Sequence, residues 1–284
     1  MNIGSNKNPM IVSVLAVLIL ALALTGCVPL GNVASPAKAP TTQDALDLVV
    51  QRGTLIVSTE LGNYPWAYKD PKTGVITGLV IDIARGYATA LGVKFQVNTY
   101  VWAGIIPALT TGKVDMVAAP LSRTIARSVK ILYCDPYVTD PGVVYALKGK
   151  YTSLSDLNKK GVILTTTAGS IHETMAKTLF PNATMNALGT VSDTTAAVLS
   201  GRANASLTSR SVGLGILKTN PKLEILPGST FMDSLACAVN FSSFKLWKSF
   251  NMYQQMIKLD GTYGKLFKQY FGVNWVPNNV QDGL

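Results

Sequence analysis

The sequence contains one histidine and only three cysteines among its 284 residues. His172 has no cysteine or carboxylate partner at the spacing of metal ligands, so the sequence does not support a metal site. The sequence also lacks the Gly-x-Ser-x-Gly pattern of a nucleophile elbow, and it has no phosphate loop of the Gly-Lys-Thr type. These absences argue against metal-dependent, serine-hydrolase and nucleotide-hydrolysing functions, and no cofactor is implied.

Charged residues are scarce, at 14% of the chain, although the formal net charge is +10. The lysines and arginines are scattered singly, and no basic run with interleaved aromatic residues occurs. We therefore expect no binding of nucleic acid, and we interpret the positive charge as surface charge that favours solubility.

One apolar run stands out, over residues 11–24, and it follows a segment whose only charge is Lys7. The run is too short for a membrane-spanning helix, and it ends in a Leu-Thr-Gly-Cys sequence that closes at Cys27. This pattern predicts a lipoprotein signal peptide over residues 1–26 and lipidation of Cys27. We expect export to the periplasm or the extracellular face of the envelope, with an uncleaved anchor as the alternative.

The segment 27–43 contains three prolines and no hydrophobic periodicity, which predicts a flexible linker after the lipidated cysteine. About 240 residues remain, enough for two lobes with separate cores. The two remaining cysteines, Cys134 and Cys237, are compatible with a disulfide or with two free thiols.

The remaining chain alternates between strand-like and helix-like segments in two similar units. In the first unit we predict strands at 54–58, 94–100 and 114–118 and helices at 79–91 and 105–111. In the second unit we predict strands at 162–166, 184–188, 205–208 and 223–226 and helices at 170–179, 192–199 and 211–218. This order predicts an α/β fold with mostly parallel sheets flanked by helices.

Two further strand-like segments, 142–147 and 235–239, flank the second unit. We expect them to pair as hinge strands through which the chain enters and leaves the second lobe. The helical segments 244–256 and 263–271 then return to the first lobe. The predicted domains are therefore lobe 1 over 44–146 and 236–284 and lobe 2 over 147–235, with a ligand cleft between them.

An arginine with two hydroxyl side chains shortly before it follows the third predicted strand. Arg127 offers a planar fork of donors, and Ser122 and Thr124 add hydroxyl groups. This arrangement is suited to binding a carboxylate. The alternative is a surface arginine that is solvated or paired with Asp135.

These features occur together with other landmarks in a fixed order along the chain. The landmarks are Tyr64-Pro65-Trp66, the segment 78–82, Trp102 with 104–109, the Thr124 to Arg127 motif, the segment 135–137, the segment 168–170 and the segment 260–263. The chain resembles the extracellular solute-binding proteins of amino-acid ABC importers, the family 3 group that contains the glutamine-binding protein. The resemblance implies a hinged periplasmic-binding-protein type II fold, not an enzyme, that acts as a monomer and delivers its solute to an ABC permease in the membrane.

The resemblance also assigns site residues, with Arg127 gripping the α-carboxylate of the ligand. Trp102, Tyr64 and Trp66 would supply aromatic walls, and Glu60 would contact the distal group of the ligand. The full set of implied ligand-binding residues is Arg127, Ser122, Thr124, Trp102, Tyr64, Trp66, Glu60, Pro120, Thr165, Gly169, Ser170, Thr208 and Ser209.

The sequence departs from the family pattern at Ser209, where an aspartate usually pairs with the ammonium of the ligand. A hydroxyl cannot neutralise a buried ammonium as a carboxylate can. Two alternatives follow: Glu60 supplies the missing negative charge and the ligand is an amino acid, or the ligand is a carboxylate or other polar solute without an α-amino group.

The same fold also includes an enzyme, cyclohexadienyl dehydratase, in which a cleft carboxylate acts as a general acid. Glu173 would take this role if burial raised its pKa toward neutrality. The alternative interpretation is a glutamate at a helix start that favours the helix dipole.

Overall fold

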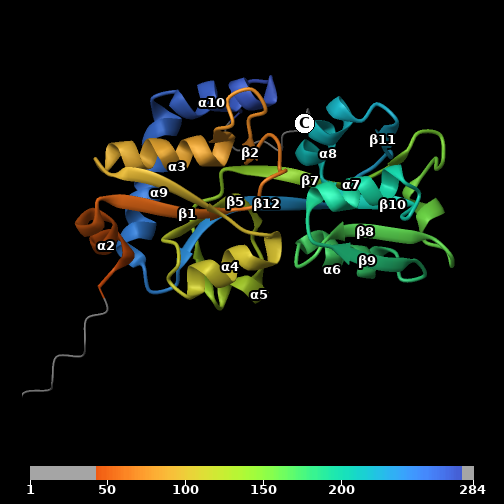
Figure 1. Ribbon diagram of the computed structural model, residues 1–284, viewed down its shortest axis with the longest axis horizontal. Helices are drawn as coiled ribbons and strands as arrows, with labels where there is room; N and C mark the ends of the chain where they lie inside the picture. Colours follow the sequence, from red (N-terminus) through yellow and green to blue (C-terminus); the bar gives the residue numbers. More distant parts are fainter. Residues whose placement is uncertain (1–42, 277–284) are drawn as a thin grey trace, which may run out of the picture. The chain divides into compact units, whose positions relative to one another are not determined.

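The first half of the described chain alternates between strands and helices, as predicted. The computed structural model describes residues 43–276 (Figure 1). Up to residue 133 the elements are α2 (Ala45–Arg52), β1 (Thr54–Thr59), β2 (Tyr68–Lys69), β3 (Ile76–Thr77), α3 (Leu79–Ala90), β4 (Lys94–Thr99), α4 (Trp102–Thr110), β5 (Met116–Ser122), α5 (Ile125–Ser128) and β6 (Ile131–Tyr133). Strand β1 pairs in parallel with both β4 and β5.

Two boundaries in this half differ from the prediction by three or more residues, and the others by two at most. Helix α4 already begins at Trp102, and β5 continues to Ser122 with every residue buried. The sequence did not predict α2, the β2–β3 hairpin, α5 or β6, all of which are short. The extension of β5 matters because it brings Pro120 and Ser122 to the carboxyl edge of the sheet.

The second half repeats the alternation. Its elements are the 3₁₀ helix η1 (Leu154–Leu157), β8 (Ile163–Thr167), α6 (Ile171–Leu179), β9 (Thr184–Leu188), α7 (Val191–Leu199), β10 (Ala205–Ser209), α8 (Arg210–Thr219) and β11 (Leu223–Ile225). Strand β8 pairs in parallel with β9 and with β10. The predicted strands and helices of this half are all present. Most of their ends are shifted by one residue, and the other ends agree.

Two long strands, β7 (Val138–Leu147) and β12 (Phe231–Asn240), connect the halves. They pair antiparallel, from Phe231 opposite Gly142 to Leu235 opposite Val138. Beyond this pairing, β12 joins β5 and β7 joins β10, so a single sheet runs in the order β4-β1-β5-β12-β7-β10-β8-β9. The two strands thus form the shared centre of the sheet, but they pair through residues 138–142 and 231–235. The predicted segments 142–147 and 235–239 instead pair mainly with β10 and β5, so the prediction that they pair with each other was wrong.

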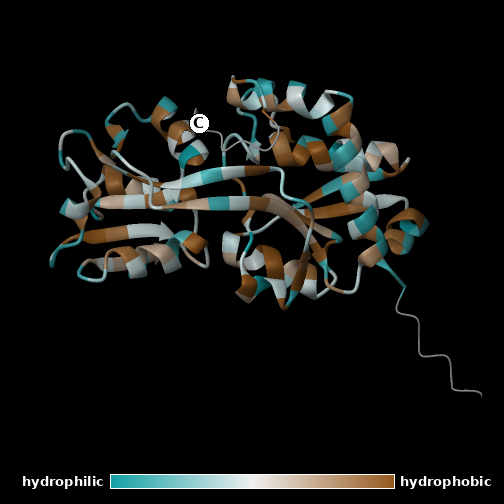
Figure 2. Ribbon diagram, turned by 180° about the vertical axis from the view of Figure 1, so that it is seen from behind, coloured by the Kyte–Doolittle hydropathy of each residue, from teal (hydrophilic) through white to brown (hydrophobic). Residues whose placement is uncertain are grey.

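The chain ends with α9 (Phe244–Leu259) and α10 (Thr262–Phe271), which pack against α3 of the first half. The rings of Tyr87 on α3 and Phe250 on α9 meet edge to face, with centroids 5.1 Å apart. Hydrophobic residues recur along the strands and these helices, interspersed with polar ones (Figure 2), and the buried ones form the core of the first half. Burial of this apolar surface holds the returning helices on the first half.

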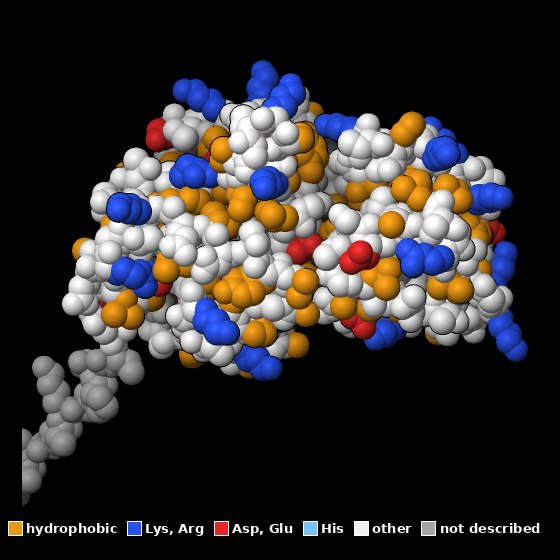
Figure 3. Space-filling view, viewed as in Figure 1, with side chains coloured by type: hydrophobic (Ala, Val, Ile, Leu, Met, Phe, Trp, Pro, Cys, Tyr) orange, Lys and Arg blue, Asp and Glu red, His pale blue; other side chains and the backbone are white. Residues whose placement is uncertain are grey.

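Lysine and arginine side chains are dispersed over the face seen in Figure 3, in agreement with their scattered positions in the sequence. Within residues 43–276, none of the helices has the length and apolar character needed to cross a bilayer. The predicted signal peptide, the lipidated Cys27 and nearly all of the predicted linker lie outside the described residues.

Candidate functional site

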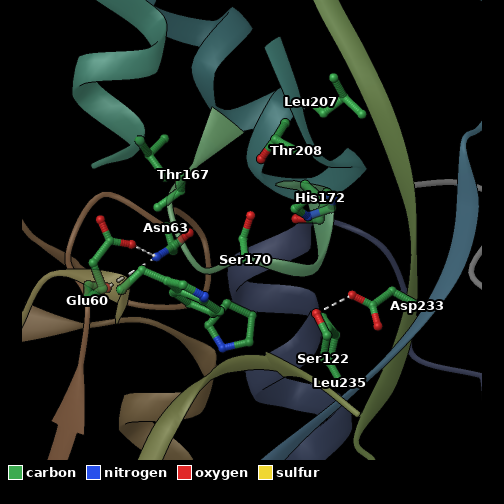
Figure 4. Close-up of a pocket in the computed structure, with 14 residues that line it drawn as sticks. Glu60, Asn63, Ser122, Thr167, Ser170, His172, Leu207, Thr208, Asp233 and Leu235 are labelled. Carbon is green, nitrogen blue, oxygen red and sulfur yellow. Dashed lines mark hydrogen bonds between the residues drawn. The ribbon is translucent and has the colours of Figure 1, made fainter. Parts of the chain in front are cut away.

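A small cavity lies where the two halves meet, at the carboxyl ends of β1, β5, β8 and β10 (Figure 4). Its volume is about 40 Å³, enough for about three water molecules. The first half and β12 contribute Glu60, Asn63, Trp102, Pro120, Ser122, Asp233 and Leu235. The second half contributes Thr167, Ser170, His172, Val191, Leu207, Thr208 and Ser209. Ligands of open α/β folds bind at this edge of the sheet.

One end of the cavity is formed by Glu60, which directly follows β1 and is only 2% exposed. The side-chain amide of Asn63 donates a hydrogen bond to Oε2 of Glu60. The other oxygen, Oε1, is buried and has no partner in the described part of the chain. Burial raises the pKa of Glu60 to about 7, although the bond from Asn63 opposes the shift.

The opposite end is formed by Asp233 on β12, a residue that sequence analysis did not select. Its carboxylate accepts a hydrogen bond of 2.6 Å from Oγ of Ser122, across 111 positions of sequence. Burial raises the pKa of Asp233 to about 6, while the bond from Ser122 and the charge of Arg127 oppose the shift. A signal existed in the sequence, because Asp233 occupies an inward position of the period-two pattern that continues with Leu235 and Cys237.

The wall from the second half is polar but uncharged. Ser170 is the N-cap residue of α6, but its side chain makes no capping bond, so it lines the cavity instead. His172, the second residue of the same helix, packs near Phe231 with ring centroids 5.3 Å apart and the rings tilted by 47°. Burial, and more weakly the charge of Arg127, lowers the pKa of His172 to about 4, so the ring is neutral at pH 7. Its Nδ1 atom is buried without a partner among the described residues.

Arg127 lies beside the cavity and connects the two halves. One guanidinium nitrogen donates to the carbonyl of Ser122 at 3.1 Å, and the other donates to the carbonyl of Gly169 at 2.8 Å. Arg127 and Gly169 are not among the residues that line the cavity. The hydroxyl of Thr124 accepts a bond from the backbone N–H of Arg127, so this threonine caps α5 and positions the arginine.

Three other predicted site residues lie away from the cavity. Trp66 is fully buried in the core of the first half, and its indole N–H donates to Oγ of Ser211 at 2.6 Å. Tyr64 packs edge to face against Tyr68. The hydroxyl of Thr165 donates to the carbonyl of Asn186, and Thr167, at the end of the same strand, faces the cavity instead.

Seven cavity residues were therefore predicted and seven were not. The predicted ones are Glu60, Trp102, Pro120, Ser122, Ser170, Thr208 and Ser209, and the additional ones are Asn63, Thr167, His172, Val191, Leu207, Asp233 and Leu235. The additional residues belong to positions that no motif marks and that only the packing of the two halves brings together.

The chain matches a known protein family over most of its length. The family model described as bacterial extracellular solute-binding proteins, family 3, matches residues 55–273. The chain belongs to this family. The fold class predicted from the sequence is thereby confirmed, with two lobes of α/β type and two connecting strands.

Individual family 3 solute-binding proteins are similar over most of the chain. The ABC transporter glutamine-binding protein GlnH of Bacillus subtilis (strain 168) is 25% identical, with 92% of this chain and 94% of that protein covered. The ABC transporter arginine-binding protein 1 of Escherichia coli (strain K12) is 26% identical, with coverage of 69% and 82%.

Solved structures superimpose well on this family 3 protein. The ancestral amino acid-binding protein AncCDT-1, a precursor of cyclohexadienyl dehydratase, has a TM-score of 0.75 and 33% identity, covering 80% of this chain and 99% of that chain. The substrate-binding protein AbpA from Streptococcus pneumoniae, bound to L-arginine, has a TM-score of 0.75 and 27% identity, covering 80% and 98%.

Glu173, the residue considered as a general acid, does not have the environment that this role requires. Its carboxylate accepts a bond from the backbone N–H of Gly169 and pairs with Lys177 at 2.7 Å. The bond from Lys177, followed by that from Gly169, lowers the pKa of Glu173. The side chain is thus an ionised group at the start of α6 that does not line the cavity.

Cys134 and Cys237 are free and buried in this structure. They are neighbours, since the backbone N–H of Cys134 donates to the carbonyl of Cys237 at 2.9 Å. Burial raises the pKa of both thiols. Within residues 43–276, no group of three or more His, Cys, Asp or Glu side chains could hold a metal ion.

Proposed function

We propose that this family 3 protein is the lipid-anchored amino-acid receptor of an ABC importer. The observation that carries the proposal is the polar cavity between the halves, with acidic groups inside it and Arg127 beside it. A cavity with groups of both signs suits a zwitterion, whose carboxylate and ammonium need partners of opposite charge. The relatives named as glutamine-binding and arginine-binding proteins of ABC transporters support this substrate class and an ABC permease as partner.

We propose that the α-carboxylate of the ligand takes over the donors of Arg127 that now bond to Ser122 and Gly169. The N-terminus of α6, behind Ser170, adds backbone N–H groups for the same anion. Trp102, Thr208 and the other predicted cavity residues contact the ligand directly. Thr124, Tyr64, Trp66 and Thr165 contribute by positioning or packing, because their side chains face away from the cavity.

The cavity is too small for an amino acid, so we propose that the halves separate for ligand entry and close over the ligand. The lobes proposed from the sequence, 44–146 with 236–284 and 147–235, would then move about β7 and β12. The contact of Arg127 with Gly169 would break on opening and be replaced by contacts with the ligand.

The test is isothermal titration calorimetry of purified full-length protein with the twenty standard amino acids and small carboxylates that lack an amine. We expect at least one amino acid to bind with a Kd in the micromolar range or below. Binding of amine-free carboxylates without any amino acid would favour the alternative, a receptor for another solute, since Ser209 replaces the usual aspartate.

The likeness to a precursor of cyclohexadienyl dehydratase makes a dehydratase the second candidate function. The carboxylate of Glu173 is already bonded to Gly169 and Lys177, which argues against Glu173 as the general acid of such a dehydratase. An assay with prephenate and arogenate decides this point, and we expect no product.

The lipid anchor requires a separate test. We expect the Cys27→Ser variant to appear in the soluble fraction, whereas the unchanged protein stays with membranes. Retention of the variant on membranes would instead indicate an uncleaved anchor. Size-exclusion chromatography of the released variant would report whether the receptor is a monomer, as we propose.

A further inference from the structure

The cavity contains two acidic side chains and no basic one. Glu60 and Asp233 lie on opposite sides of it, separated by the wall that carries Ser170 and His172 (Figure 4). A buried carboxylate without a cationic partner is unfavourable. The placement of these two groups therefore indicates a ligand that brings a positive charge to each of them.

The end near Asp233 is also the end at which Arg127 lies. Ser122 connects the two residues, since its carbonyl accepts from Arg127 at 3.1 Å and its hydroxyl donates to Asp233 at 2.6 Å. Arg127 nevertheless forms no ion pair with any carboxylate of residues 43–276. A guanidinium and a carboxylate that are held by one residue but kept apart match the α-carboxylate and α-ammonium of an amino acid, which are joined by a single carbon.

Two acceptor atoms at the cavity have no partner in the described part of the chain: Oε1 of Glu60 and Nδ1 of His172. Buried acceptors of this kind normally have a hydrogen-bond donor. The imidazole of His172 packs near Phe231, two residues before Asp233 on β12, so it lies at the Asp233 end of the cavity. Each end thus has one buried polar atom that a donor on a ligand could satisfy.

Building on the proposed function, in which Glu60 contacts the distal group of the ligand, we propose that Asp233 binds the α-ammonium, so that the distal group at Glu60 carries a positive charge of its own. The ligand is then a basic amino acid, with an ammonium or guanidinium side chain. Asp233 on the connecting strand takes over the task that Ser209 cannot perform, and His172 accepts a further bond from the same ammonium.

The first experiment measures binding of L-arginine, L-lysine and L-glutamine to the full-length protein by calorimetry, and then to Asp233→Asn. We expect the unchanged protein to prefer the two basic amino acids. We expect Asp233→Asn to weaken L-arginine binding about 30-fold or more, as for a buried charge pair that loses one member. Binding of 5-guanidinopentanoate, which is arginine without its α-amino group, should change much less.

The matched control is Asp140→Asn. Asp140 lies directly opposite Asp233 in the pairing of β7 with β12 and is fully buried, but it does not line the cavity. It accepts bonds from the backbone N–H and hydroxyl of Ser211 instead. We expect this variant to bind L-arginine with at most a few-fold change, and thermal unfolding would confirm that both variants are folded.

The second experiment uses Glu60→Gln, which should lose affinity for L-arginine and L-lysine but keep or gain affinity for L-glutamine. If amino acids bind but Asp233→Asn weakens arginine and its amine-free analogue equally, Asp233 is not the ammonium site. If the unchanged protein prefers neutral amino acids, Glu60 does not select a cation. If no amino acid binds at all, the proposed function itself fails.

Discussion

The two halves of the molecule contribute different chemistry to the cavity. The first half and β12 provide both acidic side chains, Glu60 and Asp233, and the neighbouring Arg127. The second half provides hydroxyl groups, a neutral imidazole and a helix N-terminus, but no charged side chain. Under the proposed function, one half would recognise the charges of the ligand, while the other would complete its hydrogen bonds on closure.

Such a division has a physical advantage. Charged groups that stay on one half can bind a ligand in the open, hydrated state without a change in their mutual distances. Closure of a neutral wall then removes water and strengthens these interactions without burying additional unpaired charge. The comparison of the halves therefore predicts that substitutions in the charged half affect affinity most.

The largest effect is expected for Arg127→Ala. The variant loses both donors for the ligand carboxylate, and we expect the affinity for the best amino acid to fall about 100-fold or more. Stability of the ligand-free protein should change little, because the lost bonds go to partly exposed backbone carbonyls.

Arg123→Ala is the control for this prediction. Arg123 lies in the same segment and is exposed, so its removal changes the net charge equally without touching the cavity. Calorimetry of both variants would check the prediction. Equal losses of affinity would show that general attraction of the anion, and not the fork of Arg127, holds the ligand.

A second prediction moves the negative charge from one half to the other. In the Asp233→Asn variant, a further Ser209→Asp substitution places a carboxylate at the end of β10, and we expect about tenfold of the lost affinity to return. In the unchanged protein the same substitution should instead lower the Tm at pH 8. The reason is that the new carboxylate replaces a hydroxyl that favours the ionised form of the buried Asp140, whose pKa burial already raises to about 6.

Calorimetry of the double variant and thermal unfolding of the single variant test this prediction. No recovery of binding in the double variant would mean that the second half cannot present a charge to the ligand. The division between the halves would then be fixed by geometry and not by the choice of residues.

The sequence predicted much of this site because its residues belong to local motifs. Ser122 and Arg127 stand five positions apart around a strand end, and Ser170 follows a glycine at a helix start, so short patterns were sufficient. Asp233 could not be found in this way, because its contact with Ser122 depends on how β12 lies beside β5. The long-range strand pairing that joins the two halves therefore also determines the least predictable part of the cavity.

Trp66 shows the opposite limit. Its place in a loop after the first strand suggested a wall of the ligand site, but the ring packs between Tyr137 and Phe271 in the core. Phe271 belongs to α10, which returns to the first half from the end of the chain. A local pattern cannot show which aromatic residues such a returning helix will cover.

The last prediction concerns no binding at all, but the way in which ionisation of Glu60 changes the stability of the ligand-free protein with pH. Its pKa rises from 4.5 to about 7 on folding, so the unfolded chain releases this proton at lower pH than the native protein does. The native state therefore loses stability as the pH rises from about 4.5 to 7, and the full cost remains above that range. Glu60→Gln removes the ionisation and should stabilise the ligand-free protein at pH 8 by about 1–3 kcal/mol, or about 2–12 °C in Tm.

The difference between the two proteins should vanish near pH 4.5, where Glu60 is protonated in the native state and half protonated in the unfolded chain. Asp140 and Asp233 cause a similar loss with rising pH, and His172, whose pKa falls from 6.5 to about 4, causes a gain. These contributions are common to both proteins and cancel in the comparison, which thermal unfolding between pH 4.5 and 8 can measure. A Tm difference that is independent of pH would mean that Glu60 stays ionised throughout, and the charged half would then carry its negative charge without waiting for a ligand.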